Sequence, residues 1–301
     1  MSPLSGDHAR AVMLGLGVVI SAQLMGVLAK LVLFEVPAFT FVWLQLASAG
    51  VFMFLYTIAY RRDPWPRHLV FRDWLAIVFI GVVNFGLVRM LMMMAIAQLP
   101  MNTFVFILSF VSLVTIAFSV LFLGERPGRA QVVGSLLAIF GVWLFFPEIP
   151  AVAERTGIVY ALVIVLALAA TNNVTRSLVT RNGVAFPSSL LSTFGLAIGG
   201  LPIVLAGLSL DWPPPIGGVR NGLIILANGL VGIALTQTVF NGVLKTLRSY
   251  EASVLAGSGV VWTALLAIPI LDEWLEVRQV LAIAVVLGGI LLAQSRPRIA
   301  E

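Results

Sequence analysis

The sequence predicts an all-α integral membrane protein with ten transmembrane helices, arranged as two inverted repeats of five helices each. Three observations lead to this prediction: an apolar composition, a series of long apolar runs, and a duplication of half the chain. Of the 301 residues, 60% are hydrophobic and 10% are charged, and the mean hydropathy is +1.07. A soluble surface needs about a quarter of charged residues, so we expect the chain to lie within a bilayer.

Ten apolar runs are candidates to cross a hydrocarbon core about 30 Å thick, which takes about 20 helical residues. They lack the alternation of apolar and polar residues that β-barrels show, so we expect helices. The runs cover residues 9–33, 37–60, 74–97, 99–123, 130–146, 157–178, 186–208, 219–244, 250–271 and 277–293. The first run has Arg10 at its start and no clear small-residue cleavage site, and we interpret it as a span rather than a signal peptide.

The stretch 99–144 occurs twice. A gapless shift of 148 residues places Leu99 on Leu247, Thr115 on Thr263, Glu125 on Glu273, Gln131 on Gln279 and Gly141 on Gly289. The predicted domains are therefore residues 1–148 and 149–301, each a five-helix repeat. Because five is odd, the second copy must cross the membrane in the opposite sense. Inverted repeats of this kind are a recurrent feature of secondary transporters, whose binding site lies near the midplane.

The basic residues predict the orientation. Thirteen of the eighteen lysines and arginines fall in segments on the side of the N-terminus, four fall on the other side, and Arg89 lies inside a span. Because basic residues favour the cytoplasmic side, we expect both termini to be cytoplasmic, in a multi-pass protein of the inner membrane. The same loops account for the net charge of +5, so no nucleic-acid partner is expected.

Enzyme chemistry finds no support in the sequence. There are no cysteines, and both histidines, His8 and His68, lie outside the apolar runs. No HExxH motif and no glycine-rich phosphate loop followed by lysine is present. We therefore expect no metal, no cofactor and no built-in ATP motor of the P-loop kind, and transport would be driven by gradients.

In each half, the last two runs flank a short loop with an acidic residue, which a glutamine and a glycine follow. These residues are Gly124, Glu125, Gln131 and Gly141 in the first half, and Asp272, Glu273, Gln279 and Gly289 in the second. The layout resembles the EamA repeat of the drug/metabolite transporter (DMT) superfamily. This resemblance implies a ten-helix transporter of small metabolites, commonly an exporter of amino acids or related compounds. Many relatives carry an arginine where this chain has Gln45, so no charge role is transferred to that position.

Polar side chains inside spans are costly in lipid, and they usually face the bundle interior or an aqueous cavity. Gln23 and Lys30 lie nearly two turns apart on the first span, so they share a face. The repeat register places Gln237 on the position of Arg89. The candidate substrate-binding residues are Gln23, Lys30, Asn84, Arg89, Asn172, Arg176, Gln237, Asn241 and Trp262.

The charges among these candidates are all positive, which favours a ligand with a carboxylate or phosphate, and an arginine can bind it bidentately. Lys30 and Arg176 lie near span ends, so snorkelling to the head groups is an alternative. Arg89 is either a ligand in the cavity or a snorkelling or helix-pairing residue. Asn84 lies about 140° around an α-helix from Arg89, so the two cannot both face a cavity squarely. Trp262 covers an apolar part of the substrate or contacts lipid or core.

Two repeated features are interpreted as structural. Glu125 and Glu273 lie beside helix starts, where a carboxylate favours the helix dipole, so we interpret them as capping residues rather than proton carriers. Gly134 and Gly141, matched by Ala282 and Gly289, lie on one helix face and are expected to permit close packing.

The functional prediction is a secondary transporter that moves an amino acid or related carboxylate-bearing metabolite by alternating access, in the direction of export. The alternatives are a uniporter or channel-like permease, a drug or cation efflux carrier, and a receptor that binds without transport. The expected partners are a small-molecule substrate and the lipid bilayer, and the small-residue faces are also compatible with a homodimer.

Overall fold

The computed structural model describes residues 6–57, 70–111, 113–115, 117–118, 129–145, 152–180, 188–243, 255 and 257–294. These residues form helices with short connections, and no strand occurs among them. The elements are α1 (Gly6–Leu33), α2 (Ala38–Leu55), α3 (Phe71–Ile80), η2 (Gly81–Leu87), α4 (Val88–Gln98), α5 (Met101–Leu108), α7 (Arg129–Phe145), α8 (Val152–Thr180), α9 (Ser188–Leu210), α10 (Val219–Ala227), η3 (Asn228–Leu235), α11 (Thr236–Val243), α13 (Gly259–Leu271) and α14 (Val277–Gln294).

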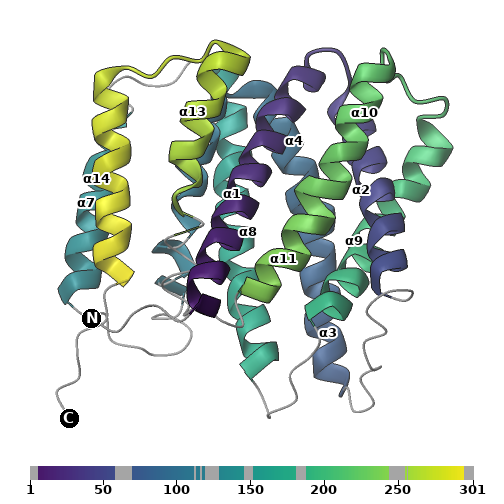
Figure 1. The fold of residues 1–301 in the computed structure, drawn as a ribbon, viewed down its shortest axis with the longest axis horizontal. Coiled ribbons are helices and arrows are strands. Elements are labelled where there is room, and N and C mark those ends of the chain that lie inside the picture. Colours follow the sequence, from purple (N-terminus) through teal and green to yellow (C-terminus); the bar gives the residue numbers. More distant parts are fainter. Residues whose placement is uncertain are drawn as a thin grey trace.

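Within the described residues, six helical segments are long and apolar enough to cross a membrane. They are 9–33, 38–55, 71–98, 154–175, 190–210 and 219–239. Four shorter apolar segments, 101–115, 132–145, 259–271 and 277–292, fall on the last two predicted runs of each half. The segments coincide with the predicted runs, so the chain is a multi-pass helical membrane protein. Figure 1 shows the bundle, in which α1 begins and α14 ends at the lower side of the view.

Prolines and one left-handed residue mark several helix ends. Pro37 and Pro100 directly precede α2 and α5, where the missing amide proton costs nothing because the first turn of a helix has no intrahelical acceptor for it. Asp272 ends α13 with a φ of 56°, a left-handed conformation that aspartate tolerates better than most residues. The chain can therefore turn back within a few residues at the upper side of the bundle.

Contacts between helices run mostly from one half of the chain to the other. The α2 helix packs on α9 with Trp43 Nε1 donating to Asp211 Oδ2 at one end (2.7 Å) and Thr57 bonded to Thr193 at the other (2.8 Å). Because Trp43 is near the start of α2 and Asp211 directly follows α9, these two helices are antiparallel. The two halves are interleaved in space rather than side by side.

Glycines bring α7 and α14 into close contact, as their spacing predicts. A Cβ on Gly141 would strike Val286, and one on Gly289 would lie 2.6 Å from the carbonyl oxygen of Gly134. This pattern also makes α7 and α14 antiparallel. The packing role expected of these glycines is confirmed, and it fits a bilayer, where dispersion between closely packed backbones replaces the hydrophobic effect.

Two π-helical segments interrupt the third and eighth spans at equivalent positions. The shift of 148 residues places η2, Gly81–Leu87, on residues 229–235, which is η3 without its first residue. A Cβ on Gly81 would lie 2.8 Å from the Gly195 carbonyl oxygen in α9, and one on Gly229 would strike Ser48 in α2. Each π-helical segment thus packs against a helix of the other half. Such segments are rare and frequently occur at functional sites.

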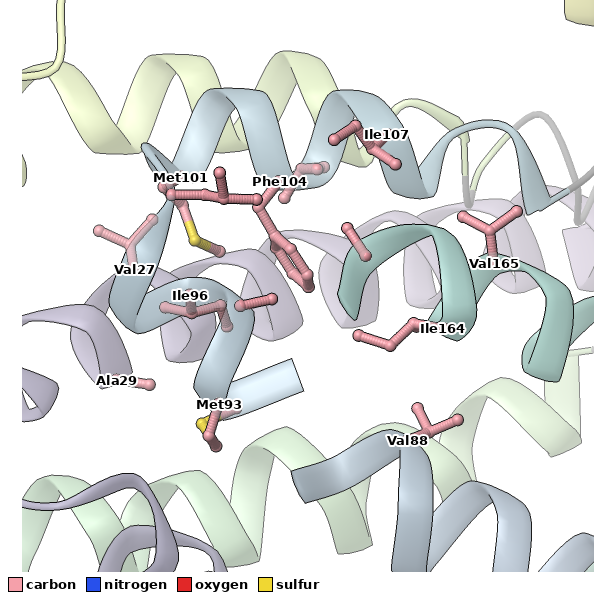
Figure 2. Packing of buried hydrophobic residues seen from close by; sticks show 14 of the residues in the cluster. Val27, Ala29, Val88, Met93, Ile96, Met101, Phe104, Ile107, Ile164 and Val165 are labelled. Atoms are coloured by element: carbon pink, nitrogen blue, oxygen red, sulfur yellow. The ribbon is translucent and has the colours of Figure 1, made fainter. Parts of the chain in front are cut away.

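The core between α1, α4, α5 and α8 is apolar. Figure 2 shows Val27 from α1, Met93 and Ile96 from α4, Phe104 from α5 and Ile164 from α8 converging on one packed region. All five are buried, with exposed fractions of 2% or less. This packing joins α1, α4, α5 and α8, and it positions the polar residues described next.

Candidate substrate-binding site

Arg89 is a cation without a counter-ion among the described residues. It is the second residue of α4, directly after η2, and its side chain is partly buried. Within the described part of the chain, no hydrogen bond or ion pair is formed by its guanidinium. A charged side chain inside a spanning helix costs free energy in lipid, so an arginine there is by default a candidate for a functional role.

Gln237 occupies the equivalent position in the second half. It is the second residue of α11, directly after η3, and it is also partly buried. Its amide has no hydrogen-bond partner within the part of the chain that the structure describes. The predicted register partners thus share a local environment. Each follows a π-helical segment, and each has a polar head without a partner among the described residues. Helix α1 packs against both α4 and α11.

Asn84 lies in η2 and accepts a hydrogen bond from Thr171 Oγ1 of α8 at 2.9 Å. The angle of about 140° between Asn84 and Arg89 assumed an ordinary α-helix, and that assumption is wrong for η2. A π-helix has more residues per turn than an α-helix, so each residue turns less about the axis. Asn84 therefore comes closer to the face of Arg89 than the sequence predicts.

Lys30, in contrast, is neutralised by the second half of the chain. Its Nζ lies 2.7 Å from Glu273 Oε1 and also donates to the Leu99 carbonyl oxygen. The other carboxylate oxygen of Glu273 accepts the backbone amide of Met101 at 2.6 Å. Glu273 therefore caps a helix start, but that of α5 and not that of α14, which follows it in the chain. We call Lys30, Glu273 and the α5 start the upper tie.

Gln23 joins α1 to α13. Its Oε1 accepts a hydrogen bond from Thr263 Oγ1 at 2.7 Å, and Thr263 is fully buried. Trp262 is the preceding residue of α13 and is partly buried. The amide of Gln23 thus holds two helices of different halves together, beside the Trp262 that the sequence proposed for contact with substrate.

The remaining candidates are placed differently. The side chain of Asn172 is exposed, whereas its neighbours Thr171 and Asn173 make the contacts of α8. The side chains of Arg176 and Asn241 lie outside the described residues, as does Glu125, the other expected cap.

Sequence reasoning missed a buried amide pair between α2 and η3. Gln45 Nε2 donates to Asn228 Oδ1, and Asn228 Nδ2 donates to the Met25 carbonyl oxygen of α1 at 2.6 Å. Both side chains are buried, with exposed fractions of 1% and 4%. The repeat register gives no signal for Asn228, because its register partner, Ile80, is apolar. Its position deep in an apolar run was the available signal, because a buried amide needs a partner.

The arrangement separates satisfied polar groups from unsatisfied ones. The Lys30 ammonium and the amides of Gln23 and Asn228 are bound to protein groups. The Arg89 guanidinium and the Gln237 amide keep their donors free among the described residues. A partly buried guanidinium with free donors has the geometry to bind a carboxylate or phosphate.

The fold and the polar groups inside its spans define a multi-pass helical membrane protein. Comparison with protein families identifies the family within this class. The model of the EamA-like transporter family matches residues 9–146 and 155–294, so the chain belongs to this family. It is therefore a membrane transporter of small solutes, and the resemblance of its repeats to EamA is confirmed.

A solved crystal structure has a similar fold. It matches with a TM-score of 0.64 over 94% of this chain and 98% of its own, at 18% sequence identity. At this identity the likeness supports the fold alone. A comparison with curated proteins gives no significant match.

Proposed function

We propose that the protein is a secondary transporter that moves a small, carboxylate-bearing metabolite by alternating access, with Arg89 as the principal ligand of the carboxylate. The observation that carries this proposal is the partly buried guanidinium of Arg89, which lacks a counter-ion among the described residues. A carboxylate supplies two acceptor oxygens in the geometry of the guanidinium fork. Gln237 provides amide donors from the equivalent position of the other half.

The directions of the helices support an inverted repeat. Lys30 near the end of α1 and Gly157 near the start of α8 both meet Leu99, so these two first helices of the halves are antiparallel. The second helices, α2 and α9, and the last helices, α7 and α14, are antiparallel as well. Two like halves in opposite senses can exchange conformations, which exposes a site between them to each side in turn.

The upper tie joins the two halves at one side of the bundle. Lys30 and Glu273 come from different halves, and the tie joins α1, α5 and the loop between α13 and α14. From the distribution of the basic residues, we expect the opposite, lower side to face the cytoplasm. The tie thus holds the two halves together on the side that we expect to face outward, which is compatible with an exporter that takes up its substrate from the cytoplasm.

Counterflow in proteoliposomes tests the function. Vesicles with the purified full chain are preloaded with amino acids, organic acids, sugar phosphates or cationic drugs, and uptake of the labelled compound is measured. Saturable, trans-stimulated uptake of a carboxylate is expected. Flux that never saturates would indicate a channel, and uptake of cations only would indicate a cation efflux carrier.

The Arg89→Ala variant tests the site. Loss of a charged hydrogen-bonding group should lower the apparent affinity or rate about tenfold to hundredfold. Arg72→Ala is the matched control, because Arg72 is exposed at the start of the same continuous span. Equal transport by both variants, at equal protein levels, would remove Arg89 from the site.

A further inference from the structure

A groove of about 410 Å³ lies between α1 and the segment formed by η3 and α11, so its walls come from different halves of the chain. On α1 it extends from Arg10 to Ser21, and on the other wall from Leu235 to Val239. The volume is within the range of small-molecule sites, about 300–1,000 Å³. None of its lining residues belongs to the candidate substrate-binding site.

The walls of the groove are apolar and face outward. Met13, Leu14 and Leu235 have exposed fractions of 67%, 48% and 44%. They lie on segments that are long and apolar enough to cross the membrane, so these exposed faces meet lipid chains rather than water. Gly17 opens the groove further, because a Cβ added there would meet no atom within 4 Å.

The polar residues that line the groove are Arg10, Ser21 and Thr236. Ser21 Oγ donates to the Gly17 carbonyl oxygen at 2.8 Å, and Thr236 Oγ1 donates to that of Val231 at 2.7 Å, so both hydroxyl protons are used within their own helices. The exposed guanidinium of Arg10 has no hydrogen bond or ion pair among the described residues. The groove therefore offers one free cation beside a long apolar surface.

We propose that this groove binds one anionic phospholipid, with the phosphate at Arg10 and an acyl chain along Leu14 and Gly17 between α1 and α11. The positive charge of Arg10 matches the anionic head group of such a lipid, and the apolar walls match its acyl chain. Basic pockets between transmembrane helices on the cytoplasmic side bind anionic head groups in this way. Because the two walls belong to different halves, the bound lipid spans the junction that must change during transport.

Native mass spectrometry of the full chain in detergent tests this site, with dioleoylphosphatidylglycerol and dioleoylphosphatidylcholine as probes. The unaltered protein is expected to retain phosphatidylglycerol in preference. Arg10→Gln should lower the affinity for phosphatidylglycerol about fivefold and leave that for phosphatidylcholine unchanged, because it removes one interfacial charge. Gly17→Leu should fill the groove and lower retention of both lipids.

Gly288→Leu is the matched control for the filling variant. Gly288 is exposed on α14, and a Cβ there also meets no atom within 4 Å, so the same bulk is added away from the groove. Ser21→Leu fills the groove from a second position in case Gly17→Leu fails to fold. Retention of phosphatidylglycerol by both filling variants at the level of Gly288→Leu would overturn the proposal. Displacement of that lipid by an equal concentration of inorganic phosphate would also overturn it, because it would show a site for a free anion.

Discussion

Two cations within the spans, Lys30 and Arg89, meet the cost of burial in different ways. Lys30 is neutralised by Glu273 of the other half, and the side chains of this pair are 10% and 17% exposed. Arg89 has no such partner among the described residues, although it too lies in a spanning segment. The protein thus supplies a carboxylate where it needs a fixed contact. Where it leaves a cation unpaired, we infer that the solute supplies the anion.

The largest effect on stability is expected from breaking the upper tie. Lys30→Met should lower the free energy of unfolding by about 3 kcal/mol, because the Glu273 carboxylate then remains mostly buried without its counter-ion. Thermal unfolding in detergent measures the change.

Arg278→Met is the matched control for the tie. Arg278 pairs with Glu276 at 3.1 Å, but these side chains are 39% and 68% exposed. Exposed pairs contribute only about 0–1 kcal/mol. Shifts of equal size in the two variants would contradict the distinction between a tie and a surface pair.

Asn228→Leu is expected to have the next largest effect. The substitution removes the partners of Gln45 and of the Met25 carbonyl oxygen, both in the interior, at a cost of about 1–3 kcal/mol. Asn172→Leu is the matched control, and it should stay within about 0.5 kcal/mol because Asn172 is exposed. The same unfolding measurement distinguishes them, and a neutral Asn228→Leu would show that the amide pair is dispensable.

In contrast to Lys30→Met, Arg89→Leu should not lower the free energy of unfolding. No hydrogen bond or ion pair of the guanidinium with a described residue is lost, so the free energy of unfolding should stay constant or rise by about 0.5–1 kcal/mol, while counterflow is lost. Parallel measurement of unfolding and counterflow checks both parts. Destabilisation as large as that of Lys30→Met would mean that Arg89 is a structural residue.

The smallest effect is expected at Gln237. Gln237→Leu should raise the apparent KM for the transported carboxylate about fivefold, which corresponds to one neutral hydrogen bond, and should leave thermal unfolding unchanged. Initial rates of counterflow over a range of substrate concentrations measure it. An unchanged KM would show that Gln237 does not bind the substrate, and the proposed ligands would then come from the first half of the chain.

Much of the architecture could be predicted from the sequence because the signals are local. Apolar runs of membrane length, the glycines of α7 and α14 and the register of 148 residues all depend on neighbours along the chain. The prominence of Arg89 could be predicted in the same way, because a lone arginine in an apolar run is costly whatever surrounds it.

The partners of the polar residues could not be predicted. Composition places Lys30 and Arg89 in the same class, and only the meeting of α1 with the loop between α13 and α14 makes one of them part of a tie. The helix that Glu273 caps could not be predicted either, since α5 is distant from Glu273 in the sequence and adjacent to it in space.

The sequence by itself therefore determined the membrane class, the duplication, the family resemblance and the spans that carry polar groups. The tertiary structure decided which of these groups are satisfied, how η2 and η3 turn their side chains, and that Asn228 joins three helices. The physical reason is range: hydropathy and repeat register act along the chain, whereas hydrogen bonds and ion pairs depend on helices that meet only after folding.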